Sequence, residues 1–466
     1  MEVDDHMGKV LQRQCCRADR QEGGSLRGVY QRASTNLLET VQNNAGQPRP
    51  IRDHPLPEEY PGAHAMDEEE IEAAVRVLRS RSLFRYYGID PQNEVDFFEA
   101  EFANYLQINH VLAVSSGTAA LHTALSALKI GPGQEVIVPA YMWVSVVAAV
   151  VNLGAIPVLA EIDQTFCLDP ADVRRKITPR TAGIIAVHMS GAQADVITLL
   201  GIARERGIFL LEDCAQCAGG SVGGKKVGTF GDIAIFSFQV NKNMSSGEAG
   251  AVATNNEQPY RRAIACHDCG CARDFSGSLL LDDEASLAWG RGCRLDELRA
   301  AVLRVQLRKM DATINRMRHS KLRVRQFLED QEKVSLRRLV DPDGDTGCFL
   351  ITIYKTAAAA RTVNERLRFH SIVCSSPETS NVVLADYGLH IYFNIAALCK
   401  KVGTDSSGTP WTLEKNRNSI YDYGRGACPV ADDLFERSQL LTVPSCLTKR
   451  DEDQVIEAFQ DALSLI

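Results

Sequence analysis

The chain has few aromatic residues and no excess of positive charge. Aromatic residues make up 7% of its 466 residues, and 51 Lys and Arg stand against 59 Asp and Glu, which gives a formal net charge of −8. Proteins that bind nucleic acid generally carry a basic surface, so this balance argues against that class. A small anionic ligand is still compatible with it, because backbone N–H groups can bind phosphate on an acidic protein.

Signals for export and for membrane insertion are also missing. Residues 1–30 are polar and lack the apolar core of a signal peptide. The uncharged stretch 136–160 is interrupted by Pro139, Gly154 and Pro157, which favours strand, helix and strand over one membrane-spanning helix. The fourteen cysteines are too dispersed for a secreted disulfide scaffold. We therefore expect a cytoplasmic protein with free, mostly buried thiols and no membrane span.

Composition divides the chain into three regions without internal repeats. Residues 1–58 are rich in Gln, Arg, Asn, Gly and Pro and are expected to form a disordered extension. Residues 59–325 are expected to form a large domain and residues 326–466 a smaller α+β domain. A capping box of Asp67 and Glu70 predicts the start of a helix. The apolar stripe of that helix is Ile71, Ala74, Val75 and Leu78.

Seven nearly uninterrupted apolar runs alternate with helical segments. Strands that are buried on both faces have this composition, and strands that alternate with helices form a mostly parallel sheet covered on both sides. We therefore expect an α/β fold with a mostly parallel seven-stranded sheet. A long amphipathic helix is expected over 295–318, a strand at 348–354 and a final helix at 451–465. The apolar runs are 110–115, 135–139, 156–160, 183–188, 208–212, 233–238 and 250–254.

Chemically useful side chains follow these runs, at the edge where parallel sheets bind ligands. Gly117 and Thr118 open a helix whose free N–H groups suit a phosphate, and Trp143 offers a flat face for an aromatic ligand. Asp213 is an anion able to keep a heterocyclic nitrogen protonated, and Lys242 is an amine able to form an imine. Together they describe a pyridoxal phosphate pocket, in which the cofactor is the electron sink and the protein supplies a lysine and a carboxylate.

Further motifs occur in a fixed order along the chain. They are Ser115-Ser-Gly-Thr-Ala-Ala-Leu121, Val136-Ile-Val-Pro139, Leu211-Glu-Asp-Cys-Ala-Gln216, Gly228-Thr-Phe-Gly-Asp232, Phe236-Ser-Phe238, Gly247-Glu-Ala-Gly-Ala-Val252 and Arg294-Leu-Asp-Glu-Leu298. In this order they resemble the DegT/DnrJ/EryC1/StrS family of fold type I sugar aminotransferases, from about residue 60 to the end. The resemblance implies a homodimeric enzyme that uses pyridoxal phosphate to move an amino group from an amino acid to a keto sugar or a related keto metabolite.

The resemblance also implies roles for individual residues. Lys242 corresponds to the lysine that forms the Schiff base with the cofactor, and Asp213 to the partner of its ring nitrogen. Gln216 corresponds to the neighbour of the ring hydroxyl, and Trp143 to the aromatic residue that stacks on the ring. The expected phosphate contacts are Gly117, Thr118 and Ser237.

The substrate pocket is less specified. His188, which follows the fourth run, together with Arg85 and Tyr86, is expected to line it, although a hydrogen-bonded core histidine is an equal interpretation of His188. Segments 83–87 and 341–349 most resemble the family branch that aminates keto-octulosonate sugars. Donor and acceptor are not predicted beyond this.

Three departures from the family pattern leave alternative reactions open. Gly292 stands where Asn is usual, residues 247–250 read Gly-Glu-Ala-Gly where Gly-Glu-Gly-Gly is usual, and the loop 266–273 is rich in cysteine. One alternative is a pyridoxal-phosphate-dependent carbanion enzyme, such as an oxygen-dependent amino-acid monooxygenase-decarboxylase. Another is a non-catalytic relative that binds the cofactor in a regulatory role.

A zinc site is a second interpretation of two cysteine groups. Cys214 and Cys217 form one pair. A structural zinc site requires four N or S ligands at regular spacing, and no second matched pair occurs, so we expect no bound metal. The other group consists of Cys266, His267, Cys269 and Cys271.

Overall fold

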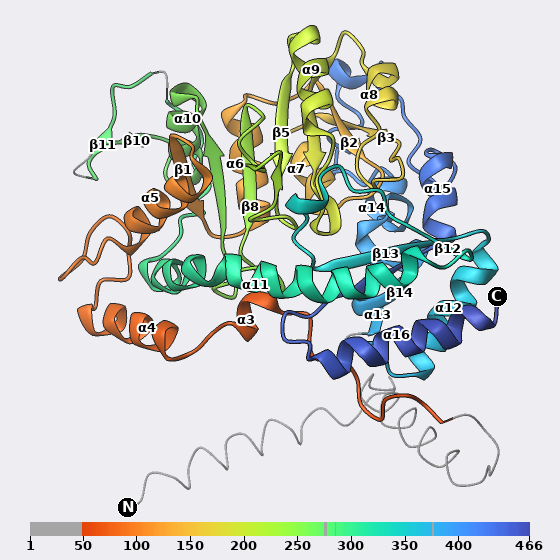
Figure 1. Ribbon diagram of the computed structural model, residues 1–466. Helices are drawn as coiled ribbons and strands as arrows, with labels where there is room; N and C mark the ends of the chain where they lie inside the picture. Colours follow the sequence, from red (N-terminus) through yellow and green to blue (C-terminus); the bar gives the residue numbers. More distant parts are fainter. Residues whose placement is uncertain (1–48, 275–276, 285, 375–376) are drawn as a thin grey trace, which may run out of the picture. The chain divides into compact units, whose positions relative to one another are not determined.

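The computed structural model of the chain is built around a seven-stranded sheet (Figure 1). Its order is β1-β9-β8-β5-β4-β2-β3, and neighbours are parallel except that β9 is antiparallel to β1 and β8. The expected mostly parallel sheet is confirmed, because every strand coincides with one of the apolar runs. The strands are β1 (His110–Val114), β2 (Glu135–Pro139), β3 (Ile156–Ala160), β4 (Thr181–Val187), β5 (Phe209–Asp213), β8 (Ile233–Ser237) and β9 (Gly250–Thr254). The structure describes residues 49–274, 277–284, 286–374 and 377–466.

Helices cover both faces of this sheet. They are α5 (Glu94–Leu106), α6 (Gly117–Ala127), α7 (Ser145–Asn152), α8 (Pro170–Lys176), α9 (Val196–Arg206), α10 (Glu257–His267) and α11 (Glu297–Glu329). Alternate residues of β1 belong to two different cores: Leu112 packs with α6, whereas Val111 and Ala113 pack with α5 and α11. The strands are therefore apolar on both sides, as their sequences predicted.

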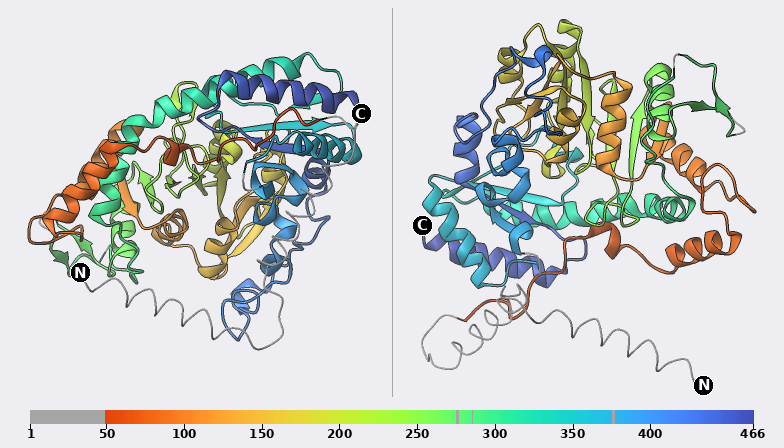
Figure 2. Two further views of the ribbon diagram at one scale, coloured as in Figure 1. Left: turned by 90° about the horizontal axis from the view of Figure 1, so that it is seen from below. Right: turned by 180° about the vertical axis from the view of Figure 1, so that it is seen from behind.

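A second, four-stranded antiparallel sheet follows α11 in the sequence. Its order is β12-β13-β15-β14. The helices α12 (Ala357–Phe369) and α16 (Lys449–Ser464) pack against each other beside it, and α16 also contacts α11 (Figure 2). This is the expected α+β part, although its predicted boundary at residue 325 lies inside α11, and the division into two domains stays a prediction. The strands are β12 (Val334–Leu336), β13 (Phe349–Tyr354), β14 (Asn381–Val383) and β15 (Ser438–Thr442).

The remaining elements of the described chain are mostly short. The hairpins β6 (Ser221–Val222) with β7 (Lys225–Lys226) and β10 (Ala272–Arg273) with β11 (Leu279–Leu280) extend from the large sheet. Within the described ranges, no helix combines the length and the apolar character needed to span a membrane. The remaining elements are α3 (Pro61–His64), α4 (Glu68–Ser80), α13 (Pro377–Ser380), α14 (Ala396–Cys399), α15 (Pro429–Glu436), η2 (Met189–Gly191), η3 (Pro342–Gly344), η4 (Leu384–Asp386), η5 (Gly388–His390), η6 (Tyr392–Asn394) and η7 (Glu414–Asn416).

The start of α4 was predicted correctly, but its buried face was not. The Asp67 side chain accepts from the first turn, and Glu70 accepts from the backbone of Asp67, which completes the capping box. The residues that α4 buries against α11 are Ala73 and Val77. The expected stripe therefore does not face the core: Ala74 and Val75 are partly buried, and Ile71 and Leu78 are exposed.

The structure describes only the last part of the predicted extension 1–58. Residues 1–48 lie outside the described part of the chain, so their expected disorder is not addressed by it. Residues 51–62, which we call the N-terminal strap, belong to the compact unit that runs from Ile51 to Ile466. Leu56 is buried in the main core, because the strap runs along folded elements instead of into solvent.

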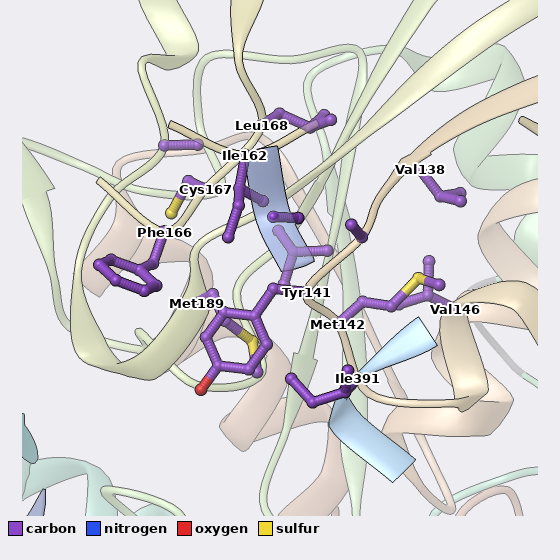
Figure 3. Close-up of a cluster of buried hydrophobic side chains, with 14 of the residues drawn as sticks. Val138, Tyr141, Met142, Val146, Ile162, Phe166, Cys167, Leu168, Met189 and Ile391 are labelled. Carbon is purple, nitrogen blue, oxygen red and sulfur yellow. The ribbon is translucent and has the colours of Figure 1, made fainter. Parts of the chain in front are cut away.

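A buried cluster joins the C-terminal part of the chain to the large sheet (Figure 3). Tyr141, two residues beyond β2, forms an isolated antiparallel bridge with Ile391. The Met142 N–H donates to the carbonyl of His390 at 3.0 Å. These contacts bring the segment around η5 to the carboxyl edge of the sheet.

Candidate active site

A cavity of about 550 Å³ lies at the carboxyl ends of β4, β5 and β8. Val187, Asp213 and Ser237, the last residues of these strands, are on its wall. Open α/β sheets bind ligands at this edge. The structure thus brings together on one cavity the seven residues expected to bind the cofactor: Gly117, Thr118, Trp143, Asp213, Gln216, Ser237 and Lys242.

Lys242 and Asp213 form the charged centre of the cavity. Burial lowers the pKa of the Lys242 amine, and the nearby charge of Asp213 only partly opposes this effect. Burial likewise raises the pKa of the Asp213 carboxyl, although its oxygen accepts from the Ala215 N–H at 3.0 Å and Lys242 favours its charged form. Each group is therefore partly desolvated, and the charge of each stabilises the charged form of the other. For Lys242 the effect of burial is the larger one, which suits an amine that must lose its proton to react.

Two helix N-termini meet at one end of the cavity. α6 begins at Gly117, and the hydroxyl groups of Thr118 and Ser145 lie 2.8 Å apart, with Ser145 opening α7. A Cβ atom at Gly117 would lie 2.7 Å from Cβ of Ser237, so only glycine leaves this end open. Helix N-termini present free N–H groups and favour anions, which makes this end a cradle of suitable chemistry for a phosphate.

Aromatic rings form another wall of the cavity. The ring centroids of Trp143 and His390 are 4.8 Å apart at 50°, and His390 stacks on Tyr387 at 4.0 Å and 7°. Burial, reinforced by the charge of Lys242, lowers the pKa of His390 to about 3, so its imidazole is neutral at ordinary pH. Sequence reasoning missed His390 and Tyr387, because no local pattern marks them and only pairing with residues 140–142 brings them here.

A hydrogen-bond chain orients Gln216 on the cavity wall. Its Oε1 accepts from the Ser190 N–H at 2.9 Å, and its Nε2 lies 3.3 Å from Nε2 of His390. Because the amide oxygen is already used, the amide nitrogen donates and the imidazole accepts. Ser190 has a φ of 52° and is held by the hydroxyl of Tyr141 at 2.8 Å and by the buried guanidinium of Arg337, which donates to the Ser190 carbonyl at 3.0 Å.

His188 lies in the core and does not line the cavity. It is fully buried, its Nε2 lies 3.1 Å from Oε2 of Glu212, and its Nδ1 accepts from the Ala194 N–H at 3.1 Å. Both ring nitrogens are therefore occupied within the protein. The interpretation of His188 as a hydrogen-bonded core residue agrees with the structure, and the expectation that it lines the substrate pocket does not.

Arg85 and Tyr86 also lie away from the cavity wall. The guanidinium of Arg85 is buried and pairs with both oxygens of Glu99 at 3.0 Å and with Asp96 at 3.2 Å. The hydroxyl of Tyr86 lies 3.3 Å from Nε2 of His267, beside the β10–β11 hairpin. Their expected place in the substrate pocket is not met within this chain, because local charge pairing holds Arg85 elsewhere.

The cysteines of the described residues are all free thiols, as expected. The donor atoms of His188, Glu212 and Cys214 lie within 4.8 Å of one another, the single group of this kind that the described residues contain. Glu212 already accepts from three backbone N–H groups besides its contact with His188, so the carboxylate and the imidazole of this group are used within the protein. The cysteines of the loop 266–271 are not part of such a group.

Comparisons with known proteins agree with this geometry. The model of the DegT/DnrJ/EryC1/StrS aminotransferase family matches residues 64–381. GDP-perosamine synthase of Vibrio cholerae is 40% identical over 225 residues, which are 48% of this chain and 59% of that protein. L-glutamine:2-deoxy-scyllo-inosose aminotransferase of Streptomyces kanamyceticus is 40% identical over 258 residues, 54% of this chain and 60% of that protein. The matches thus span about three fifths of the length of these curated relatives. The crystal structure of 3-amino-5-hydroxybenzoic acid synthase shares 28% sequence identity and a TM-score of 0.72, covering 89% of this chain and 100% of that one.

Proposed function

The chain belongs to the DegT/DnrJ/EryC1/StrS aminotransferase family, and from this premise we propose that it transfers an amino group from an amino acid to a keto sugar or a related ketone. The observation that carries the proposal is the shared cavity of Lys242 and Asp213, with the N-terminus of α6 at its end. An amine, an anion and an anion-binding helix end on one cavity are the groups that pyridoxal phosphate requires of a protein.

Pyridoxal phosphate is the cofactor of this family, and the residues present fit it. When bound, it supplies an aldehyde and a protonated ring that stabilises negative charge on the carbon beside the transferred nitrogen. Asp213 would hold the ring nitrogen protonated, and Lys242 would bind the aldehyde. Gly117 leaves room for a phosphate at the N-terminus of α6, and Trp143 offers a ring face. Thr118, Ser237 and Gln216 would add hydrogen bonds.

The chain's own contribution to proton movement is assigned to Lys242. With the cofactor bound, its Nζ would take the proton from the substrate carbon that bears the nitrogen and would hold that proton for return in the second half of the reaction. The amine must be uncharged to do this, and burial lowers its pKa in that direction. The neutral ring of His390 and the amide of Gln216 border the same space and keep it free of a second positive charge.

The substrates follow from the chemistry that the relatives' names describe. One relative is named for GDP-perosamine and another for transfer from L-glutamine to 2-deoxy-scyllo-inosose. We infer that the donor is an amino acid such as L-glutamine and that the acceptor is a ketone on a polyhydroxylated ring. We also infer a cytoplasmic location, which the free thiols of the described cysteines support.

We further infer that two copies of the chain associate. The β10–β11 hairpin region and the segment before α5 adjoin, since the guanidinium of Arg273 lies 4.0 Å from the ring centroid of Tyr86. This region exposes large apolar side chains: Trp289 is 96% exposed and Ile89 is 75% exposed. Exposed large apolar side chains suit a protein–protein contact, and a second copy of the chain is the proposed partner.

The proposal is tested by removing the amine. Lys242→Ala should abolish the visible absorbance of the bound cofactor and the transfer of nitrogen from L-glutamine to a ketone acceptor, because no other lysine of the described residues lines the cavity. Lys415→Ala, at an exposed lysine outside it, is the matched control and should keep both. Retained turnover in Lys242→Ala would refute the proposal. Oxygen uptake with the amino acid alone would instead favour the oxidative alternative.

A further inference from the structure

Arg337 is a buried cation that binds backbone oxygens. It follows β12 directly and is 2% exposed. Within the described part of the chain, the hydrogen bonds of its guanidinium go to three carbonyl oxygens and one thiol, and none goes to a carboxylate. Met189 and Cys167, two of the residues that it contacts, belong to the buried cluster in Figure 3. A buried cation without an opposite charge is costly, and neutral donors would satisfy the same carbonyls at a lower cost.

The guanidinium holds the peptide groups on both sides of Ser190. Its Nη2 donates to the carbonyl of Met189 at 2.7 Å, and its Nη1 donates to the carbonyl of Ser190 at 3.0 Å. Its Nε donates to the carbonyl of Thr165 at 2.6 Å, which fixes the plane of the group. Ser190 has a φ of 52°, a left-handed conformation that residues with side chains rarely adopt. Three donors in one plane are a property of arginine that lysine does not share.

One of these peptide groups connects the guanidinium to Gln216. The carbonyl of Met189 accepts from Arg337. The N–H of the same peptide group belongs to Ser190 and donates to Oε1 of Gln216 at 2.9 Å. The Nε2 of Gln216 lies 3.3 Å from Nε2 of His390. Hydrogen bonds in a chain polarise one another, so a positive charge at one end strengthens the donors that follow it.

This chain of hydrogen bonds determines which end of the Gln216 amide is free to bind a ligand. The amide oxygen is bound to the Ser190 N–H, so the amino group is the end beside His390, and both side chains line the cavity. The amino group has two N–H donors, of which His390 can accept one, so the other is left for a ligand. Arg337 and Ser190 are buried within one chain, so association with a second copy leaves this arrangement unchanged.

We infer, on the basis of the proposed function, that Arg337 is a positioning residue for the cofactor. It holds the peptide group between Met189 and Ser190 so that the amide of Gln216 offers an N–H, and not its oxygen, to the bound cofactor. Its charge strengthens this donor through the polarised peptide group. Arg337 itself does not line the cavity, so it acts only through Gln216.

The test is a double-mutant cycle that combines Arg337→Met with Gln216→Ala. Cofactor-free protein is titrated with pyridoxal phosphate, and the Kd is obtained from the absorbance. Arg337→Met alone should raise the Kd roughly threefold to tenfold, because a hydrogen bond to the cofactor is weakened. In protein that already carries Gln216→Ala, the same substitution should change the Kd by less than about twofold, because the residue through which it acts is gone.

The visible absorbance of the bound cofactor supplies a second readout. Gln216 is expected beside the oxygen of the cofactor ring, and a donor there favours the anionic form of that oxygen. Arg337→Met should therefore raise the pH midpoint of the absorbance change by roughly 0.5–1 unit. Gln216→Ala should also raise it, and the double variant should show no further rise. A loss of stability alone would leave the midpoint unchanged.

Arg338→Met is the matched control. This neighbouring arginine is exposed, and its guanidinium donates to Asp163 at 2.6 Å. The control should leave both the Kd and the midpoint unchanged. The inference is overturned if Arg337→Met leaves the Kd unchanged, raises it equally with and without Gln216→Ala, or leaves the midpoint unchanged.

A second variant covers the case in which Arg337→Met does not fold, as judged by a circular-dichroism melt. Arg337→Lys keeps the charge but not the three donors in one plane, and it must then show the same dependence on Gln216 for the inference to stand. Neither readout requires turnover. A protein that shows this dependence and transfers no nitrogen would refute the proposed function alone, whereas an active enzyme with independent effects of the two substitutions would refute this inference alone.

Discussion

Alanine at position 117 is expected to weaken cofactor binding in a folded protein. The added Cβ would lie 2.7 Å from Cβ and 3.0 Å from Oγ of Ser237. Cβ atoms in proteins essentially never lie closer than 3.0 Å to another heavy atom, so the contact with Cβ of Ser237 is too short. Ser237 is buried and belongs to β8, so it has little room to move, and overpacking of this kind costs about 1–3 kcal/mol of folding free energy.

The substitution also affects binding of the cofactor. A phosphate at the N-terminus of α6 would lose at least one charge-assisted hydrogen bond, worth about 1.5–3 kcal/mol, which corresponds to roughly a 10- to 100-fold rise in Kd. The measurement is titration of the cofactor-free protein with pyridoxal phosphate, followed by absorbance, beside urea unfolding. Gly201→Ala is the control: its Cβ would meet nothing within 4 Å in α9, so it should leave Kd unchanged and stabilise by roughly 0.5–1 kcal/mol. Wild-type affinity in Gly117→Ala would place the phosphate elsewhere and refute the reasoning.

Two further predictions concern His390 and the exposed apolar surface. Because the folded pKa of His390 is about 3 against 6.5 in the unfolded chain, the unfolded state binds more protons between these values, and stability falls as pH drops, by about 2 kcal/mol at pH 5. The measurement is the free energy of unfolding in urea at pH 7 and at pH 5, for the cofactor-free wild type and for cofactor-free His390→Asn. The loss of stability between the two pH values should be smaller in His390→Asn, and an equal loss in both proteins would contradict the lowered pKa. Trp289→Glu should shift the protein from dimer to monomer in sedimentation, whereas Ile420→Glu, at a residue 80% exposed elsewhere, should not. Equal sedimentation of both variants would argue against the proposed surface.

The parts of the fold and the site that follow from local pattern could be predicted from the sequence. Strands buried on both faces must be apolar throughout, so the seven runs marked the sheet and its carboxyl edge. Asp213 follows one run directly, and Lys242 follows another by a short loop, so both had to lie near that edge. The glycine at 117 was likewise readable as a helix start after a strand.

The parts that depend on long-range contacts could not be predicted in this way. His390 reaches the cavity because Met142 binds its carbonyl, and Glu59 because Gly62 binds the carbonyl of Lys242. Neither segment has a periodic pattern that indicates a partner. Arg85 illustrates the opposite failure: its side chain has suitable chemistry for a substrate, but the carboxylate of Glu99 from α5 occupies it.

Strand alternation accounts for the position of His188 and would have predicted it. Val187 and Asp213 are paired in register in the neighbouring parallel strands β4 and β5, and both line the cavity. Side chains alternate along a strand, so Glu212 and His188, each one residue away, must point to the opposite side. There they lie 3.1 Å apart and hydrogen-bond each other. Ile235 is paired with Asp213 and also lines the cavity, so the same alternation of cavity-facing and core-facing residues holds in β8. Once Asp213 is assigned to the cofactor, the residues paired with it in register, and those two positions away along each strand, are identified as facing the cavity. The residues between them on these three strands face the core.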